Sequence, residues 1–303
     1  MSPAPDRSTR VAFVLSGGAS LGAIQVGMLR ALVDHGIVPD TIVATSVGAV
    51  NGAFLASHGA TPETVEELAT LWRGVRRGNV FPLEPFTGLL GFLGARRNLV
   101  PGGALRRLVA RNVLHDRLED LPIPLHVVAC DVLSGEEVLL SRGPLVDAVL
   151  ASTAIPGVLP AIEWEGRPLV DGGVVNNTPL SHATALGARE IYVLPTGGPC
   201  ALTAPPRGAL AMLVHATGLM VSQRFTAEVA ALDGGVEVVV LPPPCPLDVQ
   251  PMDFGHADEL ISHAEADARA FLNGRAGTVV PIRRTRRHRE AQPGVGAELP
   301  PVG

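Results

Sequence analysis

The sequence lacks the patterns that mark several common classes of protein. Its three cysteines, Cys130, Cys200 and Cys245, show no C-x-x-C spacing for a metal, and their odd number does not indicate a disulfide framework. No H-E-x-x-H pattern is present either. The net charge of -5 comes without a long acidic or basic block in the body of the chain, which argues against a large nucleic-acid interface. We therefore expect no metal, no cofactor and no nucleic-acid partner, and a reducing, cytoplasmic location.

An unbroken hydrophobic run long enough to span a membrane is also missing. Residues 11–33 come nearest, since they are largely apolar and follow Arg10 as a signal peptide would. A Ser-Gly-Gly turn at residues 16–18 interrupts the run, and Gln25 and Arg30 would then have to face lipid. The pattern predicts a strand, a tight turn and a helix, with neither a signal peptide nor a transmembrane helix.

What the chain does have is ample apolar material and a regular alternation of elements. Its 303 residues are 47% hydrophobic, which suits one large α/β domain. We expect a flexible N-terminus at 1–9, the domain at 10–280, and a basic, then Pro/Gly-rich, disordered tail at 281–303. The alternation predicts an α/β fold with a central, mostly parallel sheet flanked by helices in three layers. Expected strands are 11–15, 41–44, 125–129, 137–140, 168–170, 191–194 and 236–241, and expected helices are 19–35, 47–56, 62–76, 104–114, 145–152, 206–232 and 257–272.

Ser46 is a candidate nucleophile. It falls where the strand at 41–44 gives way to a helix, and the small residues Ala44 and Gly48 stand two positions before and after it. A serine on such a sharp turn is accessible to substrate only if neighbouring side chains do not block the approach, and the helix dipole favours a developing anion. Serine is also a common helix N-cap. Taken alone, the motif leaves both roles open.

The glycine-rich stretch from Gly17 to Gly22 is a candidate oxyanion loop. It follows the first strand and opens a helix, so its backbone N–H groups would point beyond the end of the strand. The stretch reads G-G-A-S-L-G, which departs from a dinucleotide-binding G-x-G-x-x-G at Ala19. A phosphate-binding P-loop would need Lys and then Ser or Thr at the positions of Ala23 and Ile24. A plain tight turn is the remaining alternative.

Asp171 is a candidate general base. Asp-Gly is first of all a turn signal, but this pair lies between two apolar stretches. A carboxylate there, unless solvated at a sheet edge, needs a hydrogen-bonding partner, and Ser46 is a candidate for it. A triad with histidine is the less favoured alternative, because each downstream histidine falls in or near an expected helix. These histidines are His182, His215, His256 and His263.

These three pieces, in this order, resemble the patatin-like phospholipase family. The fingerprint of that family is G-G-G-x-[RK]-G, then G-x-S-x-G, then D-G-[GA], serving a Ser-Asp dyad without histidine. The likeness covers roughly residues 10–200, and residues 151–160 match the family's segment before the aspartate. The resemblance implies a nucleophile at Ser46, a base at Asp171 and an oxyanion loop at Gly17, Gly18 and Ala19. The remaining motif positions are Gly22, Ala44, Gly48, Gly172 and Gly173.

The activity implied by the resemblance is serine-dependent hydrolysis of lipid esters through a covalent acyl-enzyme. The substrate would be a phospholipid, a lysophospholipid or another acyl ester, and the alternative is a weak or inactive lipid- or membrane-binding protein on the same fold. Three positions depart from the family pattern: Ala19 replaces a glycine, Leu21 replaces Arg or Lys, and Ala44 replaces the first glycine of the elbow. We expect the loop to keep its donors if Ala19 has a negative φ.

Residues 80–103 form an irregular stretch rich in Pro, Gly and large apolar side chains. These side chains are candidates for the wall or lid of an acyl pocket, or for ordinary loop core. With Arg96 and Arg97 beside them, residues 80–97 are also a candidate peripheral membrane contact. The apolar residues are Phe81, Phe86, Leu89, Leu90, Phe92 and Leu93.

Overall fold

The chain folds around a mixed β-sheet. The computed structural model describes residues 10–82, 98–197, 208–232, 235–245 and 249–275, and within them the sheet has eight strands. The path through the sheet is β5-β6-β3-β2-β1-β7-β8, with β4 also paired to β3. The strands are β1 (Val11–Leu15), β2 (Thr41–Thr45), β3 (Leu125–Asp131), β4 (Glu137–Leu140), β5 (Ile162–Trp164), β6 (Arg167–Asp171), β7 (Glu190–Leu194) and β8 (Glu237–Val240).

The parallel part of the sheet follows from the apolar runs in the sequence. β1 lies between β2 and β7, and β3 and β8 extend the parallel pairing on either side. β2 is buried along its whole length, as expected for a strand covered on both faces. The predicted parallel sheet flanked by helices is therefore confirmed. Sequence reasoning missed β5, which has only three residues, and the antiparallel pairing of β4, β5 and β6.

Two strands meet end to end along one edge of β3. β4 occupies one edge of β3, antiparallel to it. On the other edge, β2 ends with Thr45 opposite Val128. β6 ends with Asp171 opposite Ala129, the next residue of β3. β2 is parallel to β3 and β6 is antiparallel, so their carboxyl ends face each other. The residue after β2 is therefore placed beside the last residue of β6.

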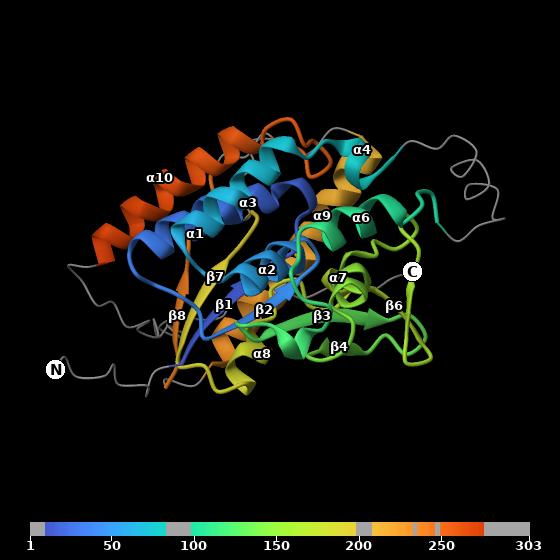
Figure 1. The fold of residues 1–303 in the computed structure, drawn as a ribbon, viewed down its shortest axis with the longest axis horizontal. Coiled ribbons are helices and arrows are strands. Elements are labelled where there is room, and N and C mark those ends of the chain that lie inside the picture. Colours follow the sequence, from blue (N-terminus) through green and yellow to red (C-terminus); the bar gives the residue numbers. More distant parts are fainter. Residues whose placement is uncertain (1–9, 83–97, 198–207, 233–234, 246–248, 276–303) are drawn as a thin grey trace, which may run out of the picture.

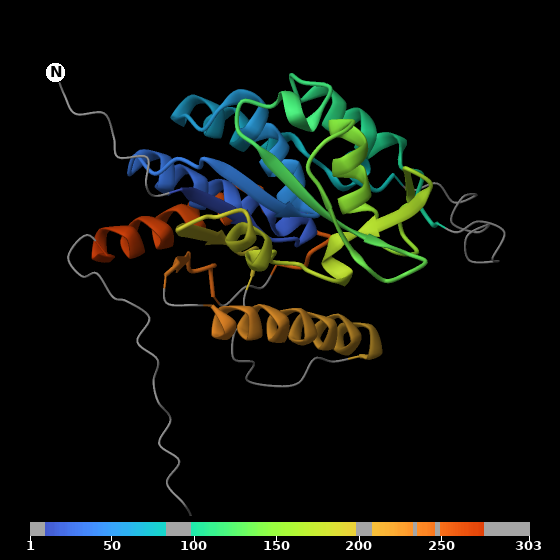
Figure 2. The ribbon, with the colours of Figure 1, turned by 90° about the horizontal axis from the view of Figure 1, so that it is seen from below.

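Helices cover both faces of the sheet. One face packs against α1, α2, α3, α6, α7 and α10 in the larger hydrophobic cluster, and the other packs against α8 and α9 in a smaller one. Figure 1 shows α10, α1 and α3 side by side, and Figure 2 shows α9 on the opposite side of the molecule from α3 and α6. The helices are α1 (Gly22–Asp34), α2 (Val47–His58), α3 (Pro62–Gly74), α4 (Arg77–Val80), α6 (Gly103–Arg111), α7 (Leu145–Thr153), α8 (Leu180–Ala185), α9 (Ala209–Ala231) and α10 (Ala257–Arg275), with short 3-10 turns η1 (Ala19–Leu21), η2 (Leu118–Asp120) and η3 (Gly172–Val174).

The start of α3 illustrates how local sequence sets a helix boundary. Thr61 adopts an extended conformation, and its hydroxyl accepts a hydrogen bond from the backbone N–H of Thr64. Pro62 occupies the first turn, where its missing N–H costs nothing, and Glu63 stands at the positive end of the dipole. The helix then buries Leu68 and Trp72 toward α2.

Several sequence-based expectations lie partly or wholly outside the described residues. Residues 1–9 and 281–303 are outside, and so is most of the apolar stretch, including Phe86, Leu89, Leu90, Phe92, Leu93, Arg96 and Arg97. Of the cysteines, Cys130 is buried with a free thiol, whereas Cys245 is disulfide-bonded, which the odd cysteine count did not predict. Among the helices described, none combines the length and the apolar character needed to cross a membrane.

Candidate active site

Ser46 occupies a strained turn between β2 and α2. Its backbone has φ 54° and ψ -124°, a conformation that non-glycine residues seldom adopt. The side chain makes no capping bond to the helix, so the alternative role of helix cap is not the one the structure shows. Gly48 makes the turn possible, because a Cβ there would lie 2.3 Å from the carbonyl oxygen of Leu15. Ala44 is wholly buried, and its methyl group fits the core.

The hydroxyl of Ser46 is hydrogen-bonded to Asp171. Ser46 Oγ donates to Asp171 Oδ2 at 2.6 Å, and the backbone N–H of Gly173 donates to Asp171 Oδ1 at 2.8 Å. Both side chains are buried, with Ser46 8% and Asp171 6% exposed. Burial raises the pKa of the Asp171 carboxyl to about 6, although both hydrogen bonds favour its charged form. A carboxylate with this pKa is able to accept a proton near neutral pH.

Ser152 holds the backbone of the turn, a role that sequence reasoning missed. The N–H of Ser46 donates to Ser152 Oγ at 2.8 Å, and that hydroxyl donates to the carbonyl of Val128 at 2.6 Å. Val128 also faces Gly172, where a Cβ would lie 2.2 Å from the same carbonyl oxygen. One residue of β3 thus sets the positions of both the serine turn and the turn after Asp171. The only signal for Ser152 was its place in the segment 151–160 that resembles the family.

Two backbone N–H groups of the glycine-rich loop have no hydrogen-bond acceptor in the described structure. The N–H of Gly17 is bonded to the carbonyl of Asn177 at 3.1 Å, so this N–H is already occupied. Within the described ranges, the N–H groups of Gly18 and Ala19 have no hydrogen-bond acceptor. Ala19 and Ser46 line the same pocket. The N–H groups of Gly18 and Ala19 are therefore unoccupied in a loop that reaches the pocket at Ala19.

Ala19 adopts a conformation that suits glycine better. Its φ is 51°, whereas the sequence-based expectation required a negative value. Leu21, in place of the cation of the family pattern, is 7% exposed and belongs to the hydrophobic core. Gly22 allows close packing, since a Cβ there would lie 2.5 Å from a methyl group of Val47 and 2.8 Å from the ring of Trp72. The loop thus packs closely against Val47 and Trp72, and the residue at position 21 is part of the hydrophobic core instead of a charged group.

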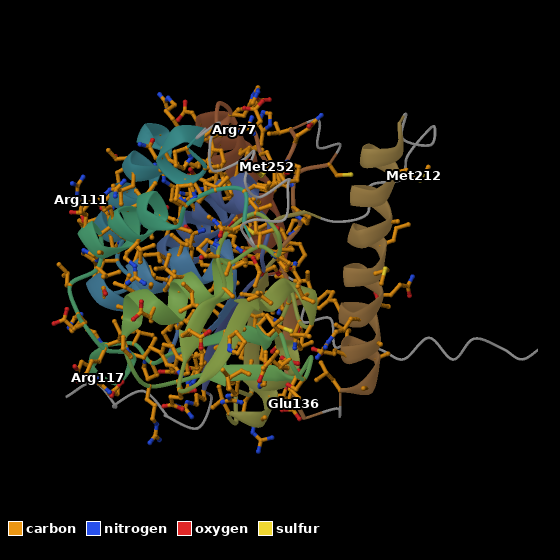
Figure 3. All side chains as sticks on the ribbon, turned by 90° about the vertical axis from the view of Figure 1, so that its right-hand side faces the viewer. Arg77, Arg111, Arg117, Glu136, Met212 and Met252 are labelled. Carbon is orange, nitrogen blue, oxygen red and sulfur yellow. The ribbon has the colours of Figure 1, made fainter. Side chains whose placement is uncertain are left out.

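A mostly apolar pocket lies beside Ser46. α2, α3 and α6 provide most of its wall. Phe81, one of the predicted wall residues, lines the pocket. The centroid of the Phe81 ring lies 6.2 Å from the centroid of the Phe254 ring. Arg77 of α4 and Arg111 of α6 lie at the outside of the molecule (Figure 3). The lining residues are Ala19, Ser46, Val47, Val50, Asn51, Phe54, Leu68, Leu71, Trp72, Val75, Val80, Phe81, Leu105, Leu108, Val109, Asn112, Val113, Thr153, Ile155, Leu159 and Phe254.

Histidines in the described part of the chain do not bond to the Ser46–Asp171 pair. His182 is bonded to Glu137 at 2.6 Å, on the other side of the sheet from the pocket helices. His256 lies between Asp253 and Glu259. His263 is exposed on α10, and the side chain of His215 is outside the described set. The pair is thus formed by Ser46 and Asp171 without an imidazole between them.

Taken together, the mixed sheet, the strained serine turn and the buried Ser-Asp pair define an α/β protein of the patatin type. Residues 13–184 match the sequence profile of the patatin-like phospholipase family, which is more than half of the chain, and the protein belongs to that family.

Similar proteins include relatives from bacteria and mammals. The chain is 34% identical over 182 residues to an uncharacterized NTE family protein of Mycobacterium tuberculosis, covering 60% of this chain and 47% of that protein. It is 29% identical over 189 residues to patatin-like phospholipase domain-containing protein 6 of Homo sapiens, covering 62% of this chain and 13% of that one. The match thus spans less than half the length of these relatives.

Among solved structures, the chain resembles VipD from Legionella pneumophila. The TM-score is 0.45 and the sequence identity 13%, over 88% of this chain and 67% of that one.

Proposed function

We propose that the protein is a serine acyl hydrolase that cleaves ester bonds of lipids through Ser46 and Asp171. The observation that carries this proposal is the 2.6 Å hydrogen bond from Ser46 Oγ to a buried carboxylate, beside an apolar pocket that Ser46 helps to line. A serine hydroxyl is a weak nucleophile by itself and needs an adjacent base. Membership of the patatin-like phospholipase family supports the same reaction class.

In the proposed reaction, Asp171 Oδ2 takes the Ser46 proton while Ser46 Oγ bonds to the ester carbonyl carbon. The carbonyl electrons move to oxygen, and the tetrahedral intermediate collapses by expelling the alcohol, which takes the proton back from Asp171. Asp171 then accepts a proton from water as that water attacks the acyl-enzyme. Collapse of the second intermediate releases the carboxylic acid and returns the proton to Ser46.

Negative charge on the intermediate needs donors in place before the reaction. The free N–H groups of Gly18 and Ala19 are the candidates, since they lie in the loop that contacts Ser46. Donors of this kind typically contribute a factor of about 100 to 1000 in rate each. Ser46 also precedes α2, whose positive dipole end faces the same developing charge.

The pocket favours an acyl chain as the bound group. Its wall is apolar apart from a few groups such as Asn51, whose polar atoms are occupied by Trp72, Gln25 and Gly22. Burial of a chain there gains about 0.8 kcal/mol for each methylene. With leucine at position 21, the loop offers no cation to an anionic head group. The proposal is accordingly made for acyl esters as a class.

The second candidate is a lipid-binding protein that keeps the fold and the pocket without turnover. Labelling by a fluorophosphonate, followed by mass analysis of the modified peptide, separates the two. Hydrolytic competence predicts covalent modification at Ser46, loss of labelling in Ser46→Ala and strong slowing in Asp171→Asn. A folded wild-type protein that binds liposomes yet remains unlabelled would favour the second candidate.

A further inference from the structure

The chain just beyond Asp171 is bonded to both of the loops that form the site. The carbonyl of Asn176 accepts a hydrogen bond from Thr45 Oγ1 at 2.8 Å, next to Ser46. The following carbonyl, that of Asn177, accepts from the N–H of Gly17 at 3.1 Å. The same short segment therefore contacts the residue before the serine and the first glycine of the loop.

The carbonyl oxygen of Gly17 is held by two side-chain donors. Asn177 Nδ2 donates to it at 3.2 Å, and Thr196 Oγ1 donates to it at 2.5 Å. Thr196 follows β7 and is 5% exposed, and Asn177 is partly buried. Water competes poorly for a hydrogen bond in such surroundings, so each bond restrains the peptide more than an exposed one would. The two donors come from separate parts of the chain and converge on one atom.

The direction of this carbonyl fixes the direction of the next N–H. In a trans peptide the C=O of Gly17 and the N–H of Gly18 point in opposite directions. Because the carbonyl is directed toward Asn177 and Thr196, the N–H of Gly18 is directed away from them. That N–H is one of the two without an acceptor in the described structure.

This peptide lies directly against the serine. A Cβ on Gly17 would be 3.0 Å from Ser46 Cβ and 2.4 Å from Asn177 Oδ1, so the loop, the serine and the asparagine are in contact. If the peptide turned over, its carbonyl would replace the Gly18 N–H beside Ser46, and both side-chain hydrogen bonds would be lost. An oxygen in that place would repel the oxyanion instead of stabilising it.

We propose that Asn177 and Thr196 are positioning residues, which hold the Gly17 carbonyl so that the N–H of Gly18 remains turned toward the oxyanion. This inference rests on the proposed hydrolase function. Neither side chain takes part in proton transfer, since both act on the loop through Gly17. Loss of either donor should impair stabilisation of the intermediate while leaving substrate binding in the pocket nearly unchanged.

The test uses the full chain with Thr196→Val, Thr196→Ser and Asn177→Ala, and short-chain nitrophenyl esters as substrates. Thr196→Val removes the hydroxyl with little change in shape, and we expect kcat to fall by about 10-fold or more with KM nearly constant, part of the effect of losing a whole donor. Thr196→Ser keeps the hydroxyl and should restore most of kcat. Asn177→Ala should lower kcat in the same way as Thr196→Val.

Two further measurements distinguish positioning from a general structural effect. Affinity for a trifluoromethyl ketone, which forms an anionic tetrahedral adduct, should fall across the variants in proportion to kcat/KM. The matched control is Thr41→Val, which removes a buried hydroxyl bonded to the carbonyl of Pro124 at the far end of β2. It should leave both measurements near the wild-type values.

The outcomes separate this inference from the function on which it rests. If wild-type protein neither hydrolyses esters nor is labelled at Ser46, the proposed function fails. If wild type is active but Thr196→Val and Asn177→Ala match it in kcat and in affinity for the ketone, the positioning role is overturned. An equal loss in Thr196→Ser and Thr196→Val would also overturn it, because the hydroxyl would then not be the group that matters.

Discussion

Ser46 Oγ and Asp171 Oδ2 lie 2.6 Å apart although 125 residues separate them in the chain. Their contact follows from the edge of β3, where β2 ends opposite Val128 and β6 ends opposite Ala129. Neighbouring positions on one strand are about 3.3 Å apart, so the two chain ends are brought within reach of a single hydrogen bond. Sheet register, more than loop conformation, sets the geometry of this pair.

Removal of either member of the pair should abolish turnover. Ser46→Ala eliminates the attacking oxygen, and Asp171→Asn eliminates the proton acceptor, so we expect each to lower kcat/KM for nitrophenyl esters by at least about 1000-fold. Asp267→Asn, on the exposed face of α10, is the matched control and should behave as wild type. Circular dichroism should show that all three fold. Undiminished turnover in either site variant would exclude the dyad.

Turnover should depend on pH through Asp171. The proposed base acts as a carboxylate, so with a pKa of about 6, kcat/KM should rise tenfold per pH unit below 6 and level off above it. A profile that is flat from pH 5 to 8 in the wild-type protein would contradict this. The rate of fluorophosphonate labelling should follow the same curve.

The free energy of unfolding should fall as pH rises, whereas kcat/KM should increase. Because the folded pKa of Asp171 exceeds the unfolded value of 3.8, the native state binds more protons between pH 4 and 6, and the free energy of unfolding falls as pH rises through that window. The shift from 3.8 to about 6 corresponds to about 3 kcal/mol. Denaturant unfolding of wild type and Asp171→Asn at each pH isolates this contribution, since the variant lacks it. A constant difference between the two proteins would show that folding does not raise the pKa of Asp171.

Ala19→Gly should stabilise the protein. A left-handed conformation costs alanine about 1 to 2 kcal/mol, and part of the gain is offset by the greater backbone freedom of glycine when unfolded. We expect a net gain of about 1 kcal/mol in the free energy of unfolding, with turnover retained because the N–H remains. Ala110→Gly on the exposed side of α6 is the control and should lose about 1 kcal/mol. Equal losses in both variants would show that Ala19 is not strained.

Val50→Phe should shorten the preferred acyl chain. Val50 lies one turn beyond Ser46 on α2 and lines the pocket, so a larger side chain there occupies space near the serine. Each methylene that is no longer buried should cost about 4-fold in kcat/KM, from about 0.8 kcal/mol per methylene. A series of nitrophenyl esters from two to sixteen carbons measures this, with Leu114→Phe as an exposed control outside the pocket. An unchanged chain-length profile would place the acyl chain elsewhere.

The sequence predicts the parts of the fold that rest on local patterns. Apolar runs of four or five residues locate β1, β2 and β7, and longer helical patterns locate α1, α3 and α10. β5 was missed because three residues carry no detectable period. The antiparallel arrangement of β4 and β6 was missed because pairing direction depends on contacts distant in sequence.

Local sequence patterns also predict only part of the candidate site. Ser46 and Asp171 belong to short motifs that indicate their chemistry, and the structure brings the two residues together. Asn177 and Thr196 act on Gly17 from 160 and 179 residues away, and no local pattern marks Thr196. The positive φ of Ala19 could have been anticipated from the glycine that the family pattern has at that position. A positive φ at a non-glycine residue can be inferred from sequence only when relatives have glycine at that position.

The hydrogen bonds to Gly17 also bear on when the site can form during synthesis. Ser46 emerges from the ribosome early, yet Asp171, the proposed base, follows 125 residues later, and Thr196 follows only after β7. Contacts of such long range form late, since the loops between them must close first. A nascent chain that ends before Asp171 would carry Ser46 without its proposed base. Under the proposed function, ester hydrolysis should appear only once β6 and β7 have joined the sheet. Onset of activity in a series of chain lengths would therefore report the arrival of β6 and β7 in the sheet.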